Sequence, residues 1–312
     1  MTVRSAAAAL AALCVLALPA PAHATGNGRW AVQPTPPATA VATPRLYFFL
    51  ESAPGGTVTD SVRLANLTDQ PLTLRLYAAD AYNTAADGGF GLRDADAHQA
   101  DVGAWTRAGA QTVVLPARRQ ADVPFTIVVP PNATPGDHVG GIVAAETLPS
   151  GRTAGADGST VAVRQAVGAR IYLRVSGAVR PGLSIDGLTG DRRGIAYTVV
   201  NTGNVHLVPQ IAVESSGLFG HRILPAAPQP KVDLVPGART RLSTPLATGW
   251  PVDVVTTKVT LTADGGVRTV ATTTVLIGVW PAIAAAVLLF LLAFWLLRRR
   301  ARYRRLRPRS VA

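Results

Sequence analysis

The chain has 312 residues, a formal net charge of +12, 48% hydrophobic residues and one cysteine. The positive charge is concentrated near the C-terminus, where eight arginines follow Leu297, so the rest of the chain is nearly neutral. This distribution argues against a nucleic-acid-binding surface, and we expect no nucleic-acid partner. Cys14 lies in a predicted leader, which excludes disulfides, thiolate metal sites and a cysteine nucleophile from the remainder.

Residues 1–24 have the pattern of a secretory signal peptide. Arg4 precedes an apolar run from Ala6 to Leu18, and Ala22-His23-Ala24 is a small-residue site that predicts cleavage after Ala24. A first membrane-spanning helix is the alternative, but the run is short for one. A lipoprotein signal is a weaker alternative, because Leu13 stands before Cys14 where a small residue is required.

Residues 25–43 are rich in Pro, Ala and Thr and predict a linker. Residues 44–178 then alternate short apolar runs with turn residues, as in Val58 to Asn66 and Leu72 to Tyr77, which we predict to form a hairpin. Further strands are expected at Thr112–Leu115, Ala121–Val129, His138–Glu146 and Val161–Val175. About seven short strands favour an immunoglobulin-like β-sandwich.

Residues 179–274 predict a second, smaller β-sandwich. Asn201-Thr202-Gly203-Asn204 is expected to form a hairpin turn between its second and third strands. Both halves share a scheme of strand, Asn-centred turn and strand, seen in Leu64 to Leu74 and in Val199 to Val208, which is consistent with a weak internal duplication.

Residues 275–297 carry no charge, and a helix of this length would reach about 35 Å, enough to cross a bilayer. Arg298, Arg299 and Arg300 begin a basic tail (298–312) that predicts a cytoplasmic C-terminus. The predicted fold is thus all-β, with two tandem immunoglobulin-like β-sandwich domains plus one C-terminal transmembrane helix. The predicted location is the plasma membrane, single-pass, with the N-terminal ectodomain outside.

Chemistry-bearing motifs are scarce. The sequence has no H-E-x-x-H, G-x-S-x-G, P-loop or S-x-x-K motif, so we predict no enzyme activity, no metal site and no cofactor. Glu51 and Glu146 could supply paired carboxylates, but a solvated strand face explains them better.

A long insertion, Asn83 to Arg107, is the first candidate for a binding surface, since loops of this length are usually functional or disordered. Glycan-binding side chains are predicted beside it, where aromatic rings could stack on a sugar and acids could hydrogen-bond to it: Asp80, Tyr82, Asp87, Phe90 and Trp105. The alternative is that most of these aromatic residues are core or loop anchors.

Five segments, taken in order, resemble one known family: Pro44–Leu50, Pro54–Val62, Asn66–Thr68, Leu76–Ala81 and Pro135–Val143. Together they are similar to the peptidoglycan-binding domain of WxL-interacting proteins over residues 44–175. The resemblance implies a signal peptide, two β-sandwiches, a membrane helix and a basic tail, with an outer domain that binds cell wall and an inner one that receives proteins. The second domain matches less well, and Trp295-Leu296 lies in the predicted anchor, so no WxL partner is assigned.

The leading hypothesis from the sequence is therefore a non-enzymatic, single-pass cell-surface protein that binds peptidoglycan or wall glycan through its outer sandwich. The alternative is a structural spacer or docking subunit that binds other surface proteins. A wall hydrolase is a third and weaker possibility.

Overall fold

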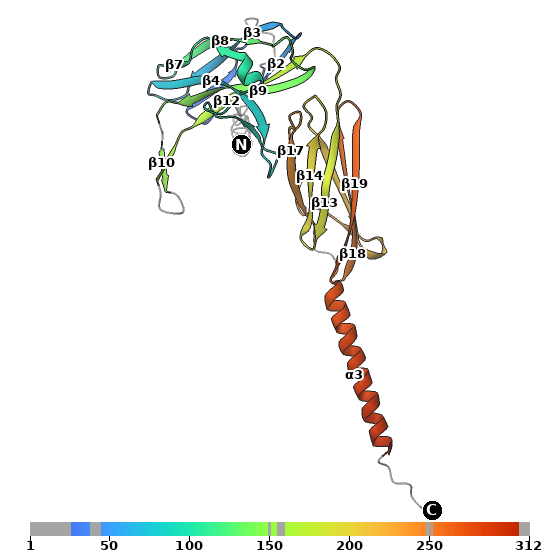
Figure 1. Cartoon of the computed structure of the whole chain (residues 1–312). Helices are drawn as coiled ribbons and strands as arrows, with labels where there is room; N and C mark the ends of the chain where they lie inside the picture. Colours follow the sequence, from blue (N-terminus) through green and yellow to red (C-terminus); the bar gives the residue numbers. More distant parts are fainter. Residues whose placement is uncertain are drawn as a thin grey trace, which may run out of the picture. The chain divides into compact units, whose positions relative to one another are not determined.

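The computed structural model describes residues 26–37, 45–148, 151–154, 160–247, 250 and 252–305. The predicted signal peptide lies outside these residues, as do residues 25 and 38–43 of the predicted linker, whereas Trp30–Pro34 within that linker form a strand. Contacts divide the chain into two compact units (Figure 1). Unit 1 comprises Met1–Asp80, Leu92–Ala133 and Val139–Leu173, and unit 2 comprises Ala81–Gly91, Thr134–His138 and Arg174–Ala312.

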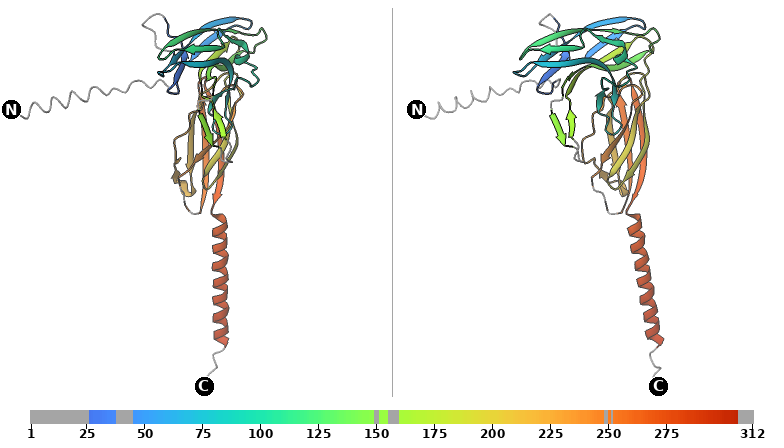
Figure 2. Two further views of the ribbon diagram at one scale, coloured as in Figure 1. Left: turned by 90° about the vertical axis from the view of Figure 1, so that its left-hand side faces the viewer. Right: turned by 60° about the vertical axis from the view of Figure 1, so that its left-hand side comes forward.

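Unit 1 is built from two antiparallel sheets. Sheet I has the order β1 (Trp30–Pro34), β3 (Thr57–Asn66), β8 (Gln120–Val128), β6 (Thr106–Ala108). Sheet II has the order β2 (Phe48–Ser52), β12 (Ala166–Val175), β9 (Gly136–Glu146), β4 (Leu72–Asn83), β5 (Phe90–Leu92), with β7 (Thr112–Leu115) also on β4. A hairpin of β10 (Gly151–Ala154) and β11 (Thr160–Val163) projects from the sandwich (Figure 2).

Alternating side chains of both sheets form the core of unit 1. Phe48 from sheet II and Phe125 from sheet I are fully buried and meet edge to face, with ring centroids 5.0 Å apart. Trp30 is also fully buried, and its indole Nε1 donates a hydrogen bond to the carbonyl of Ala144 at 3.3 Å. Burying each such aromatic side chain contributes about 2–3 kcal/mol to folding. The core thus joins the two sheets without disulfides.

The strands β3 and β4 do not form the predicted hairpin. β3 pairs with β1 and β8 in sheet I, whereas β4 pairs with β7 and β9 in sheet II. The intervening segment therefore crosses from one sheet to the other. Alternation fixes which side of a strand is buried, but it does not fix which neighbour the strand pairs with.

Unit 2 is a second two-sheet assembly. Sheet III has the order β13 (Leu183–Asp191), β14 (Gly194–Asn201), β17 (Arg239–Pro245). Sheet IV has the order β16 (Arg222–Ile223), β15 (Gln210–Ser216), β18 (Asp253–Ala263), β19 (Val267–Ile277). Its core contains Tyr197, Val199, Leu234, Val259 and Leu261. The predicted hairpin at Asn201–Asn204 is also wrong, because β14 and β15 lie in different sheets.

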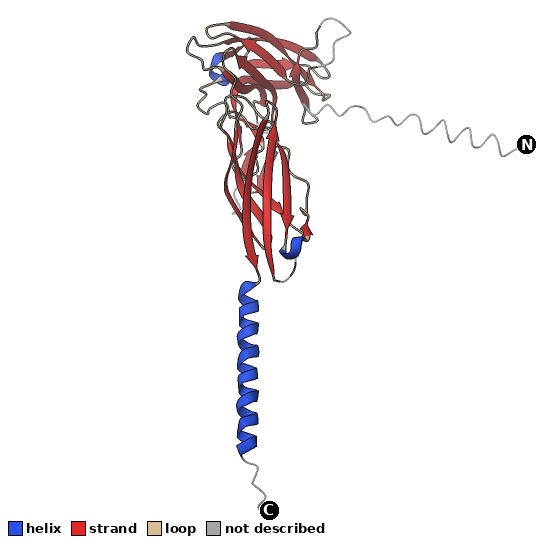
Figure 3. Ribbon diagram, turned by 90° about the vertical axis from the view of Figure 1, so that its right-hand side faces the viewer, coloured by secondary structure: helices blue, strands red, loops and turns tan. Residues whose placement is uncertain are grey.

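Two β-sandwich-like units of mostly strand thus confirm the all-β prediction. Helix is limited in the described chain to α2 (Val102–Trp105), the single 3₁₀ turn η1 (Leu218–Gly220) and α3 (Val279–Arg305) (Figure 3). Arg298, Arg299 and Arg300 lie within α3, where the guanidinium of Arg298 covers the ring of Phe294 at 4.8 Å.

The predicted membrane anchor requires a correction. Val275 to Ile277, which the prediction placed in a spanning helix, are the last residues of β19. Among the described residues, no helix combines the length and the apolar content needed to cross a bilayer. The prediction of a single-pass plasma-membrane protein with an outer ectodomain and a cytoplasmic tail is corrected accordingly.

Candidate functional site

Asp80, the first predicted site residue, is a structural carboxylate in unit 1. It is 7% exposed, and its two oxygens accept hydrogen bonds from the backbone amides of Ala100 (2.6 Å), Asp101 (3.1 Å) and Gly103 (2.7 Å). These bonds fold the insertion back onto β4 and hold the start of α2. A carboxylate that already accepts this many backbone bonds has little capacity left for a ligand.

Asp87, another predicted residue, serves the turn in which it stands. Its Oδ1 accepts a hydrogen bond from the Gly89 amide at 3.0 Å and a second from the Thr84 hydroxyl. These bonds lower the pKa of Asp87, the Thr84 hydroxyl contributing most. The side chain is thereby committed to shaping the insertion.

The three predicted aromatic residues differ in their exposure. Tyr82 is 40% exposed and its ring lies against the backbone of Gly91, where an added Cβ would be 2.6 Å from Tyr82 Cζ. Phe90 and Trp105 are half-buried. Tyr82, Asp87 and Phe90 belong to unit 2, whereas Asp80 and Trp105 belong to unit 1.

The tip of the insertion is a packing element of unit 2. The side-chain Nδ2 of Asn83 donates a hydrogen bond to the backbone carbonyl of Asp233 at 2.7 Å, and the side-chain Oδ1 accepts one from the backbone amide of Val235 at 2.9 Å. The Ala85 carbonyl accepts the amide of Arg241 on β17 at 2.7 Å. The segment that the sequence offered as a binding loop is therefore engaged by backbone groups about 150 residues away in sequence.

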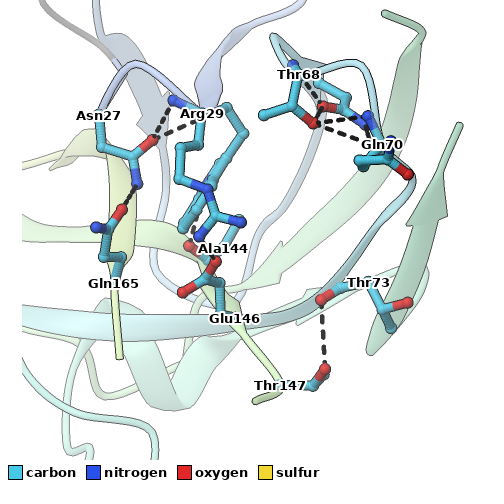
Figure 4. Close-up of polar contacts among 11 residues, drawn as sticks. Asn27, Arg29, Thr68, Gln70, Thr73, Ala144, Glu146, Thr147 and Gln165 are labelled. Atoms are coloured by element: carbon cyan, nitrogen blue, oxygen red, sulfur yellow. Dashed lines mark hydrogen bonds and ion pairs between the residues drawn. The ribbon is translucent and has the colours of Figure 1, made fainter. Parts of the chain in front are cut away.

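Glu146 does not lie on a solvated strand face as predicted. It is 8% exposed, and its Oε1 accepts a hydrogen bond from the guanidinium of Arg29 (Figure 4). Next to this pair, the Asn27 amide donates to Gln165 Oε1 at 2.6 Å. These contacts attach the segment leading into β1 to sheet II.

Among the described residues, no group of three or more His, Cys, Asp or Glu side chains could hold a metal ion.

The sequence reasoning overlooked an aromatic platform on sheet II, formed by Tyr47, Phe49, Arg170 and Tyr172. The rings of Phe49 and Tyr172 are stacked, with centroids 5.2 Å apart and an interplanar angle of 13°. Tyr47 meets both edge to face, and the Arg170 guanidinium lies 5.4 Å from the centre of its ring. Phe49 nevertheless remains 66% exposed.

The signal for this platform was present in the run Tyr47-Phe48-Phe49. Successive side chains of a strand point to opposite faces, so a core position for Phe48 places Tyr47 and Phe49 on the outer face. Large aromatic side chains on an outer face indicate contact with something other than the core of the same domain.

The platform lies beside an open sheet edge. β2 ends the order of sheet II, and no described strand pairs with its outer side. An edge strand presents alternate backbone N–H and C=O groups that can pair with an added strand.

Five other edge strands of the described sheets are protected, and β13 and β19, the remaining edges of sheets III and IV, lie next to each other. β5, β6 and β16 are only two or three residues long. β1 ends in Pro34, and the outer side of β17 receives the Ala85 carbonyl at Arg241. Short strands, proline and covering backbone all hinder the addition of a further strand. β2 has none of these devices and carries an exposed phenylalanine.

Comparison with family models finds no match, and comparison with curated proteins finds none either. The resemblance to WxL-interacting proteins therefore stays a prediction. Solved structures similar to this chain include a complex of a fimbrial chaperone with its tip adhesin (11% identity, TM-score 0.38, covering 80% of this chain and 98% of that one). Another is the Pseudomonas aeruginosa CupB2 chaperone (11% identity, TM-score 0.36, 74% and 97% covered). A third is the Acinetobacter baumannii CsuC–CsuE chaperone–tip subunit complex (11% identity, TM-score 0.39, covering 73% of this chain and 95% of that one).

The predicted function is corrected by these observations. Two of the predicted glycan-binding acids, Asp80 and Asp87, already accept hydrogen bonds from within the protein and are committed to shaping the insertion. Peptidoglycan or wall glycan is not retained as a partner, and neither is a membrane-anchored cell-surface role.

Proposed function

We propose that this chain is a non-enzymatic binding protein that captures an extended segment of another polypeptide by adding it as a strand to the outer edge of β2. The observation that carries the proposal is the combination of an unprotected edge strand with an exposed Phe49 on the adjoining face. Neither feature benefits the isolated unit, because an open, apolar strand edge is an aggregation hazard.

The edge and the platform would serve different purposes. Backbone hydrogen bonds to β2 give affinity that is independent of sequence, at about 0.5–1.5 kcal/mol each. The platform selects one side chain of the added strand, because an aromatic or proline ring can pack on Phe49 and Tyr47. Arg170 adds a cation that favours an acidic or aromatic neighbour. The predicted ligand is an extended segment with an aromatic residue or proline at alternate positions.

A selection from a library of linear peptides tests the proposal. The full chain is used as bait, and binders are measured against wild type and Phe49→Ser. We expect Phe49→Ser to weaken binding at least tenfold, since exposed aromatic anchors commonly contribute 2 kcal/mol or more. Phe219→Ser is the matched control, because Phe219 is also a highly exposed phenylalanine, at 88%, and lies outside unit 1. It should leave binding unchanged.

A second arm tests the strand addition itself. N-methylation of alternate backbone amides in a selected peptide removes donors while keeping its side chains, and we expect it to abolish binding. Binders that tolerate every such methylation, or that are lost equally in the two phenylalanine variants, would overturn the proposal.

A further inference from the structure

A groove of about 440 Å³ lies on the outer face of sheet III, near the turn between β13 and β14. Its floor is made of small residues, because Ala196 pairs with Ser243 and Gly194 pairs with Pro245 on that face. Gly194 has a φ of 152°, and an added Cβ would collide with the Thr244 carbonyl. The hollow is therefore required by the backbone and is not a side effect of one missing side chain.

Two arginines line this groove without partners. Among the described residues, the guanidiniums of Arg193 and Arg241 make no ion pair and no hydrogen bond, and both side chains are exposed. Arg239 shows what pairing looks like on the same face of β17, since its guanidinium lies 2.8 Å from Asp186. Among the described residues, Arg193 and Arg241 thus differ from Arg239 in having no acidic partner.

The acid in the groove does not supply that counterion. Asp191 Oδ1 accepts the amides of Arg193 at 2.7 Å and of Gly194 at 3.1 Å, which engages the carboxylate in its own turn. Ser243 adds a hydroxyl to the lining. Two guanidiniums with one engaged carboxylate give the groove a positive balance, and a guanidinium matches phosphate and carboxylate through paired N–H donors.

The spacing of the two arginines indicates a ligand with more than one charge. Arg193 lies opposite Leu246, whose amide donates to the Arg193 carbonyl, and Leu246 is five residues from Arg241 along β17 and its continuation. At about 3.3 Å per residue, the backbones of the two arginines are roughly 16 Å apart. Arginine side chains reaching inward from both ends would meet anionic groups several ångströms apart. A single small anion could engage both only with strongly bent side chains.

We propose that this groove binds a small organic polyanion with at least two phosphate or carboxylate groups, held between Arg193 and Arg241. The site is independent of the proposed strand addition, because the groove belongs to unit 2 and β2 belongs to unit 1. Either proposal can therefore fail without the other.

Calorimetric titration of the full chain tests this site with three probes: fructose 1,6-bisphosphate, citrate and inorganic phosphate. We expect the bisphosphate or citrate to bind with a Kd on the order of 1 mM or below at low salt. Inorganic phosphate should bind at least tenfold more weakly. The ratio of bisphosphate to citrate affinity distinguishes a phosphate ligand from a carboxylate ligand.

Variants locate the binding. Arg193→Gln and Arg241→Gln should each weaken it at least tenfold, whereas Arg239→Gln should leave it unchanged. Ala196→Leu fills the floor without altering charge and should abolish binding, with the melting temperature checking that the variant folds. No binding of either polyanion at 10-fold above the expected Kd, or equal losses in Arg239→Gln and Arg241→Gln, would overturn the proposal.

Discussion

Unit 1 and unit 2 each contain a sheet-to-sheet crossing organised by one buried asparagine. In unit 1, Asn66 Nδ2 donates to the carbonyls of Gln70 at 2.8 Å and Leu115 at 3.1 Å, and its Oδ1 accepts the Thr68 amide at 2.9 Å. The side chain thus joins the end of β3 to the loop that follows it and to the end of β7.

Asn201 repeats this arrangement in unit 2. Its Nδ2 donates to the carbonyls of Val205 at 2.8 Å and Leu234 at 3.0 Å, and its Oδ1 accepts the Gly203 amide at 3.0 Å. The acceptor four residues ahead and the donor two residues ahead are the same in both units. An amide side chain is needed because the corner requires donors and an acceptor from one group.

The turn next to each asparagine shows how the two units differ. The Arg119 amide donates to the Pro116 carbonyl across a turn that holds Arg118 at a φ of 58°. The corresponding bond in unit 2 runs from Ala238 to Val235, and the residue at this place is Gly237, with a φ of 76°. Glycine adopts this conformation readily, whereas arginine does so under strain. The two corners therefore share their hydrogen bonds although the residues of their turns differ, and the internal duplication stays a prediction.

Replacing either asparagine should have the largest effect on stability of the changes considered for the two corners. Asn66→Ala and Asn201→Ala should each destabilise their unit by about 2–4 kcal/mol, because several backbone groups lose their partner. Asn→Asp at either place should also destabilise, since a carboxylate cannot donate. Urea unfolding of the full chain measures both, and a loss below about 0.5 kcal/mol at one site would show that the two corners are not equivalent.

Buried carboxylates give a second contrast. Asp137 in unit 2 accepts bonds from Arg174 and from the His206 amide, whereas Glu146 in unit 1 has one buried oxygen without a hydrogen bond in the described chain. Asp137→Ala should therefore cost about 2–3 kcal/mol and Glu146→Ala about 1–2 kcal/mol. Thermal unfolding gives the order, and a larger loss at Glu146 would reverse this interpretation of the contacts.

Exchanging the turn residues sharpens the comparison further. Gly237→Ala should destabilise unit 2 by about 1 kcal/mol, because alanine is disfavoured at a positive φ. Arg118→Gly should raise the melting temperature of unit 1, since it relieves the strained conformation. Calorimetry on both variants tests for shifts of opposite sign, and shifts of the same sign would contradict the equivalence of the two turns.

The smallest expected effect is the loss of stability at low pH that comes from one cross-strand ion pair of unit 1. Arg63 on β3 lies opposite Asp122 on β8, and its hydrogen bonds lower the pKa of Asp122. The pair therefore stabilises the folded protein fully above the pKa of Asp122 in the unfolded chain, near 3.9. This stabilisation is lost as the pH falls through the lower pKa of Asp122 in the folded protein. Asp122→Asn should flatten the acid end of the stability curve, measured as melting temperature between pH 2 and 5. An unchanged slope would remove this pair from the account.

Much of the fold could be predicted from the sequence, but the pairing of strands could not. Alternation in Val58 to Asn66 correctly located β3, yet the same pattern suits a strand in either sheet, and the turn-forming asparagines favoured hairpins. The deciding contacts, such as Asn66 with Leu115, join residues 49 apart in sequence. Local patterns carry no information about such partners.

The candidate sites were harder still to predict. The insertion at 83–107 had the length of a functional loop, but its tip is bound by Asp233 and Arg241, about 150 residues away. The platform depends on stacking between Phe49 and Tyr172, and the groove depends on which arginines find an acid. Each of these contacts joins residues that are far apart in the sequence, so no local motif predicts it.

Hydrogen exchange of the β2 amides, Phe48 to Ser52, tests the central claim most directly. Spectra of the full chain are compared with and without a saturating selected peptide. The account predicts that alternate amides of this strand gain at least tenfold protection, as new backbone bonds form on the open edge. A peptide that binds tightly while every β2 amide exchanges at its original rate would contradict strand addition.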